Sequence, residues 1–217
     1  MSKPKVINKL IYLLCFIAIF ITFYTSLIVS FFPDLNNWIK VLLYYGGRII
    51  VVVIPFFKIL KRDIKDFFDN KKEYINKIIK TFSITILFYI PVTLVLNLIL
   101  GSNSTNQNLI SEIPLWITAI LGIIVAPISE EILFRGFLRK IFKNDYVFIV
   151  LSGIIFGIVH CMYIEENWLM YLFVLPYAVM GIGFAKLYTK TNNIFANIII
   201  HFLWNLIGVL GMLILSI

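Results

Sequence analysis

The sequence predicts an all-α membrane protein, a helical bundle of about seven transmembrane helices that forms one domain over residues 1–217. Two observations on composition point to this class. Hydrophobic residues make up 61% of the 217 residues and charged residues only 14%, whereas soluble domains are about half apolar and about a quarter charged. The mean hydropathy is +0.97, and a soluble fold of this size has too little interior to hide that much apolar surface. A third observation is that the apolar residues lie in long runs, which suits membrane-spanning helices.

Seven runs are long and apolar enough to cross a bilayer, which takes about 20 mostly apolar residues. They cover residues 7–32, 38–60, 81–100, 113–138, 146–163, 168–188 and 194–217. The first run is too long for a signal peptide and lacks a small-x-small cleavage site, so we expect a retained helix. Cys15 and Cys161 lie within apolar runs and show no metal-ligand spacing, so we expect no disulfide.

The basic residues predict how the chain is oriented. Sixteen of the 19 Lys and Arg residues lie before residue 10 or within 58–80, 139–143 and 186–190, which are alternate connections. The connections between them, 33–37, 101–112 and 163–167, hold four acids and no base. Because Lys and Arg concentrate in short cytoplasmic loops, we expect a multi-pass protein of the cell membrane with a cytoplasmic N-terminus.

The net charge of +8 does not indicate nucleic acid, because these bases lie between apolar runs. We interpret them as topology signals and as contacts to anionic lipid. Residues 61–80 mix bases with large apolar side chains, which predicts an amphipathic helix along the inner membrane surface.

A few polar residues interrupt the predicted spans, and ionisable groups there are costly and usually functional. They are Glu130, Glu131 and Arg135 in 113–138, His160 in 146–163, and His201 and Asn205 in 194–217. At 1.5 Å per residue from the cytoplasmic ends, Glu130, His160, His201 and Asn205 lie about 14, 21, 12 and 18 Å deep. These depths agree within helix tilt, so we expect three helices to meet at one polar site.

Helical geometry assigns partners within each segment. Glu131 and Arg135 are i,i+4 neighbours in the favourable order, whereas Glu130 points about 100° away from that pair. A carboxylate in such a low-dielectric site suits general-base chemistry. His201 and Asn205 share one face, which Asn197 extends by a turn. Gly153 and Gly157 form a small-x3-small pattern that lets another helix come close.

One carboxylate and two histidines suit two kinds of hydrolytic chemistry. Zinc could be bound by Glu130, His160 and His201, with an open position for water. Alternatively, Glu130 could deprotonate water directly while His and Asn donors hold the oxyanion of a tetrahedral intermediate. Each polar residue alone also has a structural interpretation, as an internal ion pair, a buried histidine or an interhelical hydrogen bond. Their shared depth favours a functional site.

These residues resemble a known family. The motifs are Glu130-Glu131-x3-Arg135, Phe156-x3-His160 and His201-x3-Asn205. Together they resemble the CAAX prenyl protease and bacteriocin-processing enzyme (CPBP) family of intramembrane peptidases over about residues 113–210, which we expect to form the catalytic core. The resemblance implies a helical fold with a cavity open to the cytoplasm. It also implies that Glu130 activates water, that His160, His201 and Asn205 complete the site, and that Glu131 and Arg135 support it.

The resemblance leaves the cofactor and the substrate open. The family is described both as metalloproteases and as metal-independent glutamate proteases. We expect the lipid bilayer and a membrane-associated or leader-bearing peptide or protein, such as a bacteriocin precursor, as partners. The alternative is a non-enzymatic membrane protein for bacteriocin self-immunity or partner binding. A small transporter is a third reading, but the sequence lacks an evident inverted repeat.

Overall fold

The protein is described from a computed structural model that covers residues 49–100, 115–161 and 168–215, with a few isolated positions before residue 48. The predicted span 7–32, the first part of 38–60, and the connections 33–37, 101–112 and 163–167 lie wholly or mostly outside the described residues. Within the described ranges every regular element is helical, which confirms the predicted all-α class. The division into a domain over 1–217 and a core over 113–210 stays a prediction.

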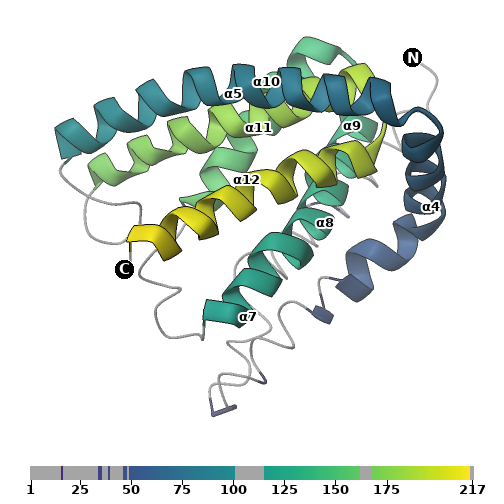
Figure 1. Cartoon of the computed structure of the whole chain (residues 1–217), viewed down its shortest axis with the longest axis horizontal. Helices are drawn as coiled ribbons and strands as arrows, with labels where there is room; N and C mark the ends of the chain where they lie inside the picture. Colours follow the sequence, from purple (N-terminus) through teal and green to yellow (C-terminus); the bar gives the residue numbers. More distant parts are fainter. Residues whose placement is uncertain are drawn as a thin grey trace.

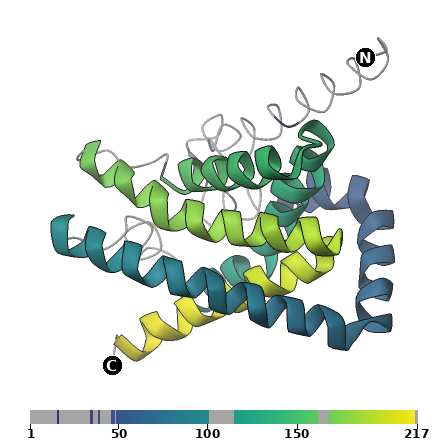
Figure 2. The same ribbon diagram turned by 90° about the horizontal axis from the view of Figure 1, so that it is seen from above.

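The described chain folds into helices that pack along one another, with α4 set across one end (Figures 1 and 2). The main helices are α4 (Ile54–Asp69), α5 (Lys71–Leu100), α10 (Asp145–His160), α11 (Val174–Thr191) and α12 (Ile194–Leu215). The run between α5 and α10 consists of α7 (Leu115–Ile120), η2 (Leu121–Val125), α8 (Ala126–Glu131), η3 (Ile132–Phe137) and α9 (Leu138–Ile141). Short elements precede α4 and α11, namely η1 (Ile49–Val53) and η4 (Trp168–Phe173).

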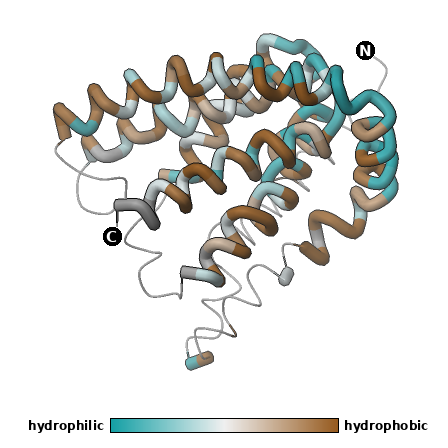
Figure 3. Tube along the Cα trace, in the orientation of Figure 1, coloured by the Kyte–Doolittle hydropathy of each residue, from teal (hydrophilic) through white to brown (hydrophobic). Residues whose placement is uncertain are grey.

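Three of the described segments are long and apolar enough to cross a membrane: Lys71–Leu100, Tyr171–Thr191 and Ile194–Gly211. Asp145–His160 is a shorter apolar helix. Along α5 many large apolar side chains are exposed, and Leu98 is 85% exposed. Figure 3 shows this helix as largely hydrophobic. Such a surface suits contact with lipid tails, which are as apolar as leucine. The fold is therefore a helical membrane bundle, as predicted.

The prediction of a separate surface helix over residues 61–80 is wrong in its bounds. Residues 61–69 continue α4, and α5 already begins at Lys71, ten residues before the predicted span at 81. The chain turns at Asn70, whose backbone N–H and side-chain amide both donate to the Asp66 carbonyl oxygen (3.1 and 3.2 Å). The Tyr74 ring then stacks on Phe67 at 5.4 Å. This turn divides the basic segment between the end of α4 and the beginning of α5.

The turn between α4 and α5 is held by the side chain of Asp66. Its carboxylate accepts hydrogen bonds from the Tyr74 hydroxyl, from Asn193 and from Asn70. The first two of these bonds lower the pKa of the Asp66 carboxyl most strongly, because they stabilise its charged form.

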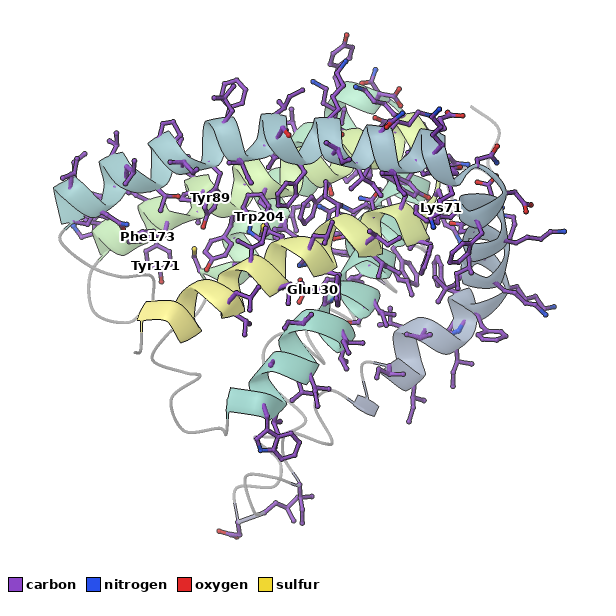
Figure 4. All side chains as sticks on the ribbon, viewed as in Figure 1. Lys71, Tyr89, Glu130, Tyr171, Phe173 and Trp204 are labelled. Carbon is purple, nitrogen blue, oxygen red and sulfur yellow. The ribbon has the colours of Figure 1, made fainter. Side chains whose placement is uncertain are left out.

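The basic connections gather at the end of the bundle that carries α4. Lys71 lies there in Figure 4, and Figure 3 shows the same end as hydrophilic. The Lys77 ammonium donates to the Lys190 carbonyl oxygen at 3.4 Å, which ties the start of α5 to the end of α11. At the start of α10, Asp145 forms an ion pair with Arg139 of α9, with 2.5 Å between the two charged groups. This clustering agrees with the alternation of basic connections that the sequence predicts.

The run from α7 to α9 contains two π-helical turns that flank α8. Pro127 is the second residue of α8 and cannot donate a backbone hydrogen bond. The N–H of Ala126, the first residue, reaches back five residues to the Leu121 carbonyl oxygen. The second π turn, η3, follows directly after Glu131. Such π turns often lie at functional sites. Here they set the rotation of α8, the helix that carries Glu130 and Glu131.

Two glycines let α10 and α11 pack with their backbones close together. A methyl group built on Gly157 would lie 2.5 Å from the Val174 carbonyl oxygen, and one on Gly153 would lie 2.9 Å from the Ile182 nitrogen. Gly181 faces back onto Gly153 in the same way, at 2.9 Å from its Cα. The predicted small-x3-small contact is confirmed, and α11 is the helix that uses it.

This contact predicts a clear stability difference between two Gly→Ala variants. Gly157→Ala forces a methyl group against backbone, so we expect it to lower the free energy of unfolding by about 1–3 kcal/mol. Gly208→Ala is the matched control, because a methyl group there meets nothing within 4 Å among the described residues. Thermal unfolding in detergent compares the two variants. Equal midpoints for both would contradict the close contact between α10 and α11.

Candidate active site

Three helices bring their polar residues to one buried place in the bundle. Glu130 and Glu131 end α8, His160 ends α10, and His201 lies in the third turn of α12. Glu130 is 6% exposed, and Glu131 and His201 are at most 1% exposed. Figure 4 shows Glu130 between the ribbons of α8 and α12. The expected meeting of three helices at one polar site is therefore observed.

Glu131 is the centre of a hydrogen-bonded network within this site. Its Oε2 atom lies 3.1 Å from the Arg135 Nε, one helical turn away, and accepts from the Asn197 amide at 3.2 Å. Its Oε1 atom lies 2.8 Å from the His201 Nδ1. The predicted pairing with Arg135 is present, and the carboxylate additionally holds two side chains of α12.

Arg135 is wholly buried and stays charged, so it needs a surrounding that replaces water. Besides Glu131, its guanidinium donates to the Gly181 carbonyl oxygen at 3.1 Å. The rings of Phe134, Phe156 and Phe184 lie 5.9, 5.1 and 5.5 Å from its central carbon. Such cation–π contacts help when a cation is desolvated. A shell of rings and one carbonyl thus encloses the ion pair.

The two imidazole rings approach Glu130 through their Nε2 atoms. His160 Nε2 lies 3.7 Å from Glu130 Oε2, and His201 Nε2 lies 3.9 Å from the same oxygen. These separations exceed a direct hydrogen bond. Polar groups at this spacing are commonly bridged by a water molecule.

The opposite ring nitrogens fix the tautomers of both histidines. His160 Nδ1 lies 2.8 Å from the Phe156 carbonyl oxygen, which can only accept a hydrogen bond, so Nδ1 carries the hydrogen. His201 Nδ1 likewise faces the carboxylate of Glu131. In the neutral rings both Nε2 atoms are therefore acceptors directed at Glu130. A group with hydrogens to donate, such as water, suits the space that the three acceptors share.

Aromatic side chains hold the His160 ring in place. Tyr177 of α11 stacks on it, with the centroids 4.9 Å apart and the planes 22° apart. Phe156, one turn earlier on α10, lies 4.2 Å from it. The ring is thus enclosed from two helices, and its Nε2 edge is left to face Glu130.

Asn205 lies one turn beyond His201 on α12. Its amide nitrogen donates to the Gly122 carbonyl oxygen in the π turn η2 at 2.8 Å. That bond uses one of the two hydrogens of the amide. The bond ties α12 to the helical run that carries Glu130.

The geometry also bears on a bound metal ion. Over 49–100, 115–161 and 168–215, no group of three or more His, Cys, Asp or Glu side chains is arranged to hold one. Glu130, His160 and His201 converge, but their described arrangement is not a formed three-ligand site of the kind that zinc uses.

Sequence reasoning missed two partners of the site. Asn197 appears in the sequence as part of a polar stripe, yet here it donates both to Glu131 and to the Phe184 carbonyl oxygen (2.7 Å). The bond between His201 and Glu131 was also not expected. The spacing of Asn197 and His201 could have indicated these contacts. The two residues are i,i+4 neighbours and therefore lie on the same face of α12.

The fold and the site define a polytopic helical membrane protein with a buried site of carboxylates and histidines. Residues 112–207 match the family model described as type II CAAX prenyl endopeptidase Rce1-like. All the site residues named above lie within this match. This match confirms the resemblance to the CPBP family that the motifs in this part of the chain show.

Several bacterial proteins are similar to this chain. YxdF of Lactococcus lactis, a protein of the group UPF0177, is 36% identical over 89 residues, which are 41% of this chain and 46% of YxdF. A second member from that organism, YvdC, is 31% identical over 64% of this chain and 54% of its own length. YdiL of Bacillus subtilis, whose name assigns it provisionally to the membrane peptidases, is 37% identical over 49% of this chain and 42% of YdiL.

The chain spans about half the length of the relatives it matches. No solved structure matches it at a significant level.

Proposed function

We propose that the chain is an intramembrane endopeptidase that hydrolyses a peptide bond of a membrane-associated or leader-bearing substrate. The observation that carries this proposal is the convergence of two imidazole Nε2 atoms on one oxygen of Glu130, at 3.7 and 3.9 Å, inside a buried site. The match of residues 112–207 to the family model of type II CAAX prenyl endopeptidases supports it further.

In the proposed reaction Glu130 is the general base. A water molecule between Glu130 Oε2 and His160 Nε2 would donate one hydrogen to each, because both atoms are acceptors. Glu130 takes a proton from that water as its oxygen attacks the carbonyl carbon of the scissile bond. The tetrahedral intermediate then collapses when the amine leaves, and Glu130 returns the proton to the leaving nitrogen.

His201 and Asn205 would stabilise the oxyanion of the intermediate. Glu131 holds the His201 ring at its Nδ1 atom, and when Nε2 also carries a hydrogen, that Nε2–H can donate to the oxyanion. Asn205 has a second amide hydrogen beyond the one bonded to Gly122. Donors fixed before the reaction stabilise developing charge at little cost of reorganisation. Arg135 would act through Glu131, by holding that carboxylate in place.

This mechanism uses only residues of the chain and is written for direct activation of water by glutamate. If zinc is used instead, Glu130, His160 and His201 would be its ligands, and the three side chains would have to move into a tetrahedral arrangement. Zinc would then supply the activation of water.

The test of the function compares membranes from cells that produce the wild-type chain and the Glu130→Gln variant. Mass spectrometry of peptide termini should find at least one cleaved product that depends on Glu130. If both membranes contain the same termini, the proposal fails. Resistance of the cells to a bacteriocin that persists in the variant would then favour self-immunity without hydrolysis.

We also propose that the basic end of the bundle faces the cytoplasm, which places the N-terminus there as well. The gathering of Lys and Arg around α4 and the start of α5 supports this orientation.

Labelling with a membrane-impermeant thiol reagent tests the orientation. The chain's own two cysteines are first replaced by alanine. In intact cells we expect no labelling of a Lys72→Cys variant, whose position is exposed at the basic end. A Ser104→Cys variant, in the connection without bases, should be labelled. Permeabilised cells are the control, where Lys72→Cys should also react. The reverse pattern in intact cells would contradict the orientation.

A further inference from the structure

Asp63 is a buried carboxylate that lies outside the candidate active site. It is 2% exposed although it belongs to the basic helix α4. Its Oδ2 atom accepts the backbone N–H of Ile194 at 2.7 Å, and its Oδ1 atom accepts from the Arg62 guanidinium at 2.7 and 2.9 Å. Ile194 is the first residue of α12. Asp63 thus satisfies an N–H group that the helix itself leaves without an acceptor.

Asn193 completes the connection between α4 and α12. This residue is wholly buried and precedes α12, where its side-chain oxygen accepts from the Ala196 N–H at 2.9 Å, as an N-cap does. Its amide nitrogen donates to the Asp63 carbonyl oxygen at 2.8 Å and to the Asp66 carboxylate at 3.0 Å. Two side chains and one carbonyl of α4 therefore hold the beginning of α12.

The first turn of α12, which these bonds hold, lies close to the candidate active site along the helix. His201 follows Ile194 by seven residues, which is nearly two full turns or about 10 Å along the helix. The two residues therefore point to nearly the same side of α12. The His201 Nδ1 lies 2.8 Å from Glu131, and a displacement of about 1 Å along the line between the two atoms would take them beyond hydrogen-bond distance. The negative charge of Asp63 also favours the N-terminus of α12, where the helix dipole is positive.

We infer that Asp63 is a positioning residue of the candidate active site: it fixes the axial position of α12 and thereby keeps the His201 ring on Glu131. This inference concerns the site on which the proposed function rests, so its test reads the His201 ring directly and needs no substrate.

The chain contains only two histidines, His160 and His201, which makes the ring of each one observable. The full chain, produced with ¹⁵N-labelled histidine and without a histidine tag, is studied by NMR in detergent micelles. His201→Gln assigns the two rings. In Asp63→Ala we expect exchange of the His201 Nδ1–H with solvent to accelerate by about 2- to 30-fold, the factor that corresponds to the loss of one N-terminal cap. The His160 ring is the internal reference, and its signal should stay unchanged.

Matched variants separate positioning from general stability. Asp69→Ala removes an exposed carboxylate of the same helix and should leave both rings unchanged. Asp63→Asn keeps an oxygen that can accept the Ile194 N–H, so we expect it to restore most of the wild-type His201 signal. Asp63→Asn also serves as the test variant if Asp63→Ala does not fold. Its His201 signal should then shift from that of the wild type, by less than is expected for Asp63→Ala.

The inference would be overturned if folded Asp63→Ala melted at a lower temperature with the His201 ring unaltered or, where only Asp63→Asn folds, if the His201 signal of that variant did not shift at all. Asp63 would then only stabilise the fold. Equal changes in the His160 and His201 rings would also overturn it, because they would indicate general loosening. Failure to find a cleaved substrate would count against the proposed function and would leave this result standing.

Discussion

Glu130→Gln should fold and accumulate like the wild type while losing nearly all turnover. Glutamine has almost the same shape as glutamate but cannot accept a proton from water. Loss of a general base lowers the rate by about 10²–10⁴-fold. The measurement is cleavage of the peptide that the comparison of membranes identifies, with protein level and unfolding temperature recorded for the same preparation.

His160→Ala and His201→Ala should follow Glu130→Gln in activity. Because the three groups act as a unit, the Glu130→Gln/His201→Ala double variant should be little worse than either single variant. A metal chelator separates the two chemistries: it leaves activity intact if glutamate acts directly, and abolishes it if zinc is required. Full cleavage by a well-produced Glu130→Gln variant would exclude Glu130 as the general base, whereas full bacteriocin resistance of that variant without cleavage would favour immunity or partner binding.

Glu131→Gln is expected to fail for a different reason, although it changes the adjacent residue in the same way. Glu131 accepts hydrogen bonds from Asn197 and from His201 and neutralises Arg135, all in a buried site. Removing one partner of a buried ion pair costs about 3–5 kcal/mol, because the other charge is left uncompensated. We therefore expect less folded protein in the membrane and a lower unfolding temperature, together with loss of activity.

A double variant tests that explanation. In Glu131→Gln/Arg135→Gln the buried charge is removed along with its partner, so stability should recover in part relative to Glu131→Gln alone. A thermodynamic cycle over the four proteins gives the coupling of the two side chains. Activity should not return, because the carboxylate that orients His201 is still missing. A Glu131→Gln variant as stable as Glu130→Gln would contradict the role of Glu131 as the centre of the network.

The parts of this site that the sequence could predict are those that depend on one helix at a time. The pair of Glu131 and Arg135 follows from helical spacing alone. The common depth of Glu130, His160 and His201 follows from helix rise and the positions of the basic connections. The structure contains the ion pair, and it brings the three side chains together as that common depth predicts.

Contacts between helices were harder to predict, because they depend on how each helix is rotated about its axis. The bond between Glu131 and His201 joins residues 70 positions apart, and the one between Asp63 and Ile194 joins residues 131 positions apart. The π turns beside α8 change its rotation in a way that an ideal helix does not predict. The segment 61–80 differs from the prediction for another reason. Its composition suggests a separate helix, but the turn at Asn70 divides its basic residues between the end of α4 and the start of α5.

The surroundings of Arg135 have a consequence for how the protein is made. The Gly181 carbonyl that binds this guanidinium belongs to α11, and the two other side chains that bind Glu131 belong to α12, so both arrive after α8 during synthesis. Until then the neighbour one turn away in the same helix is the only partner in this network that can neutralise the arginine. The pair can therefore enter the membrane as a self-compensated unit, and the histidine of α12 completes the site afterwards. A peptidase built in this order would stay inactive on the ribosome until α12 has docked.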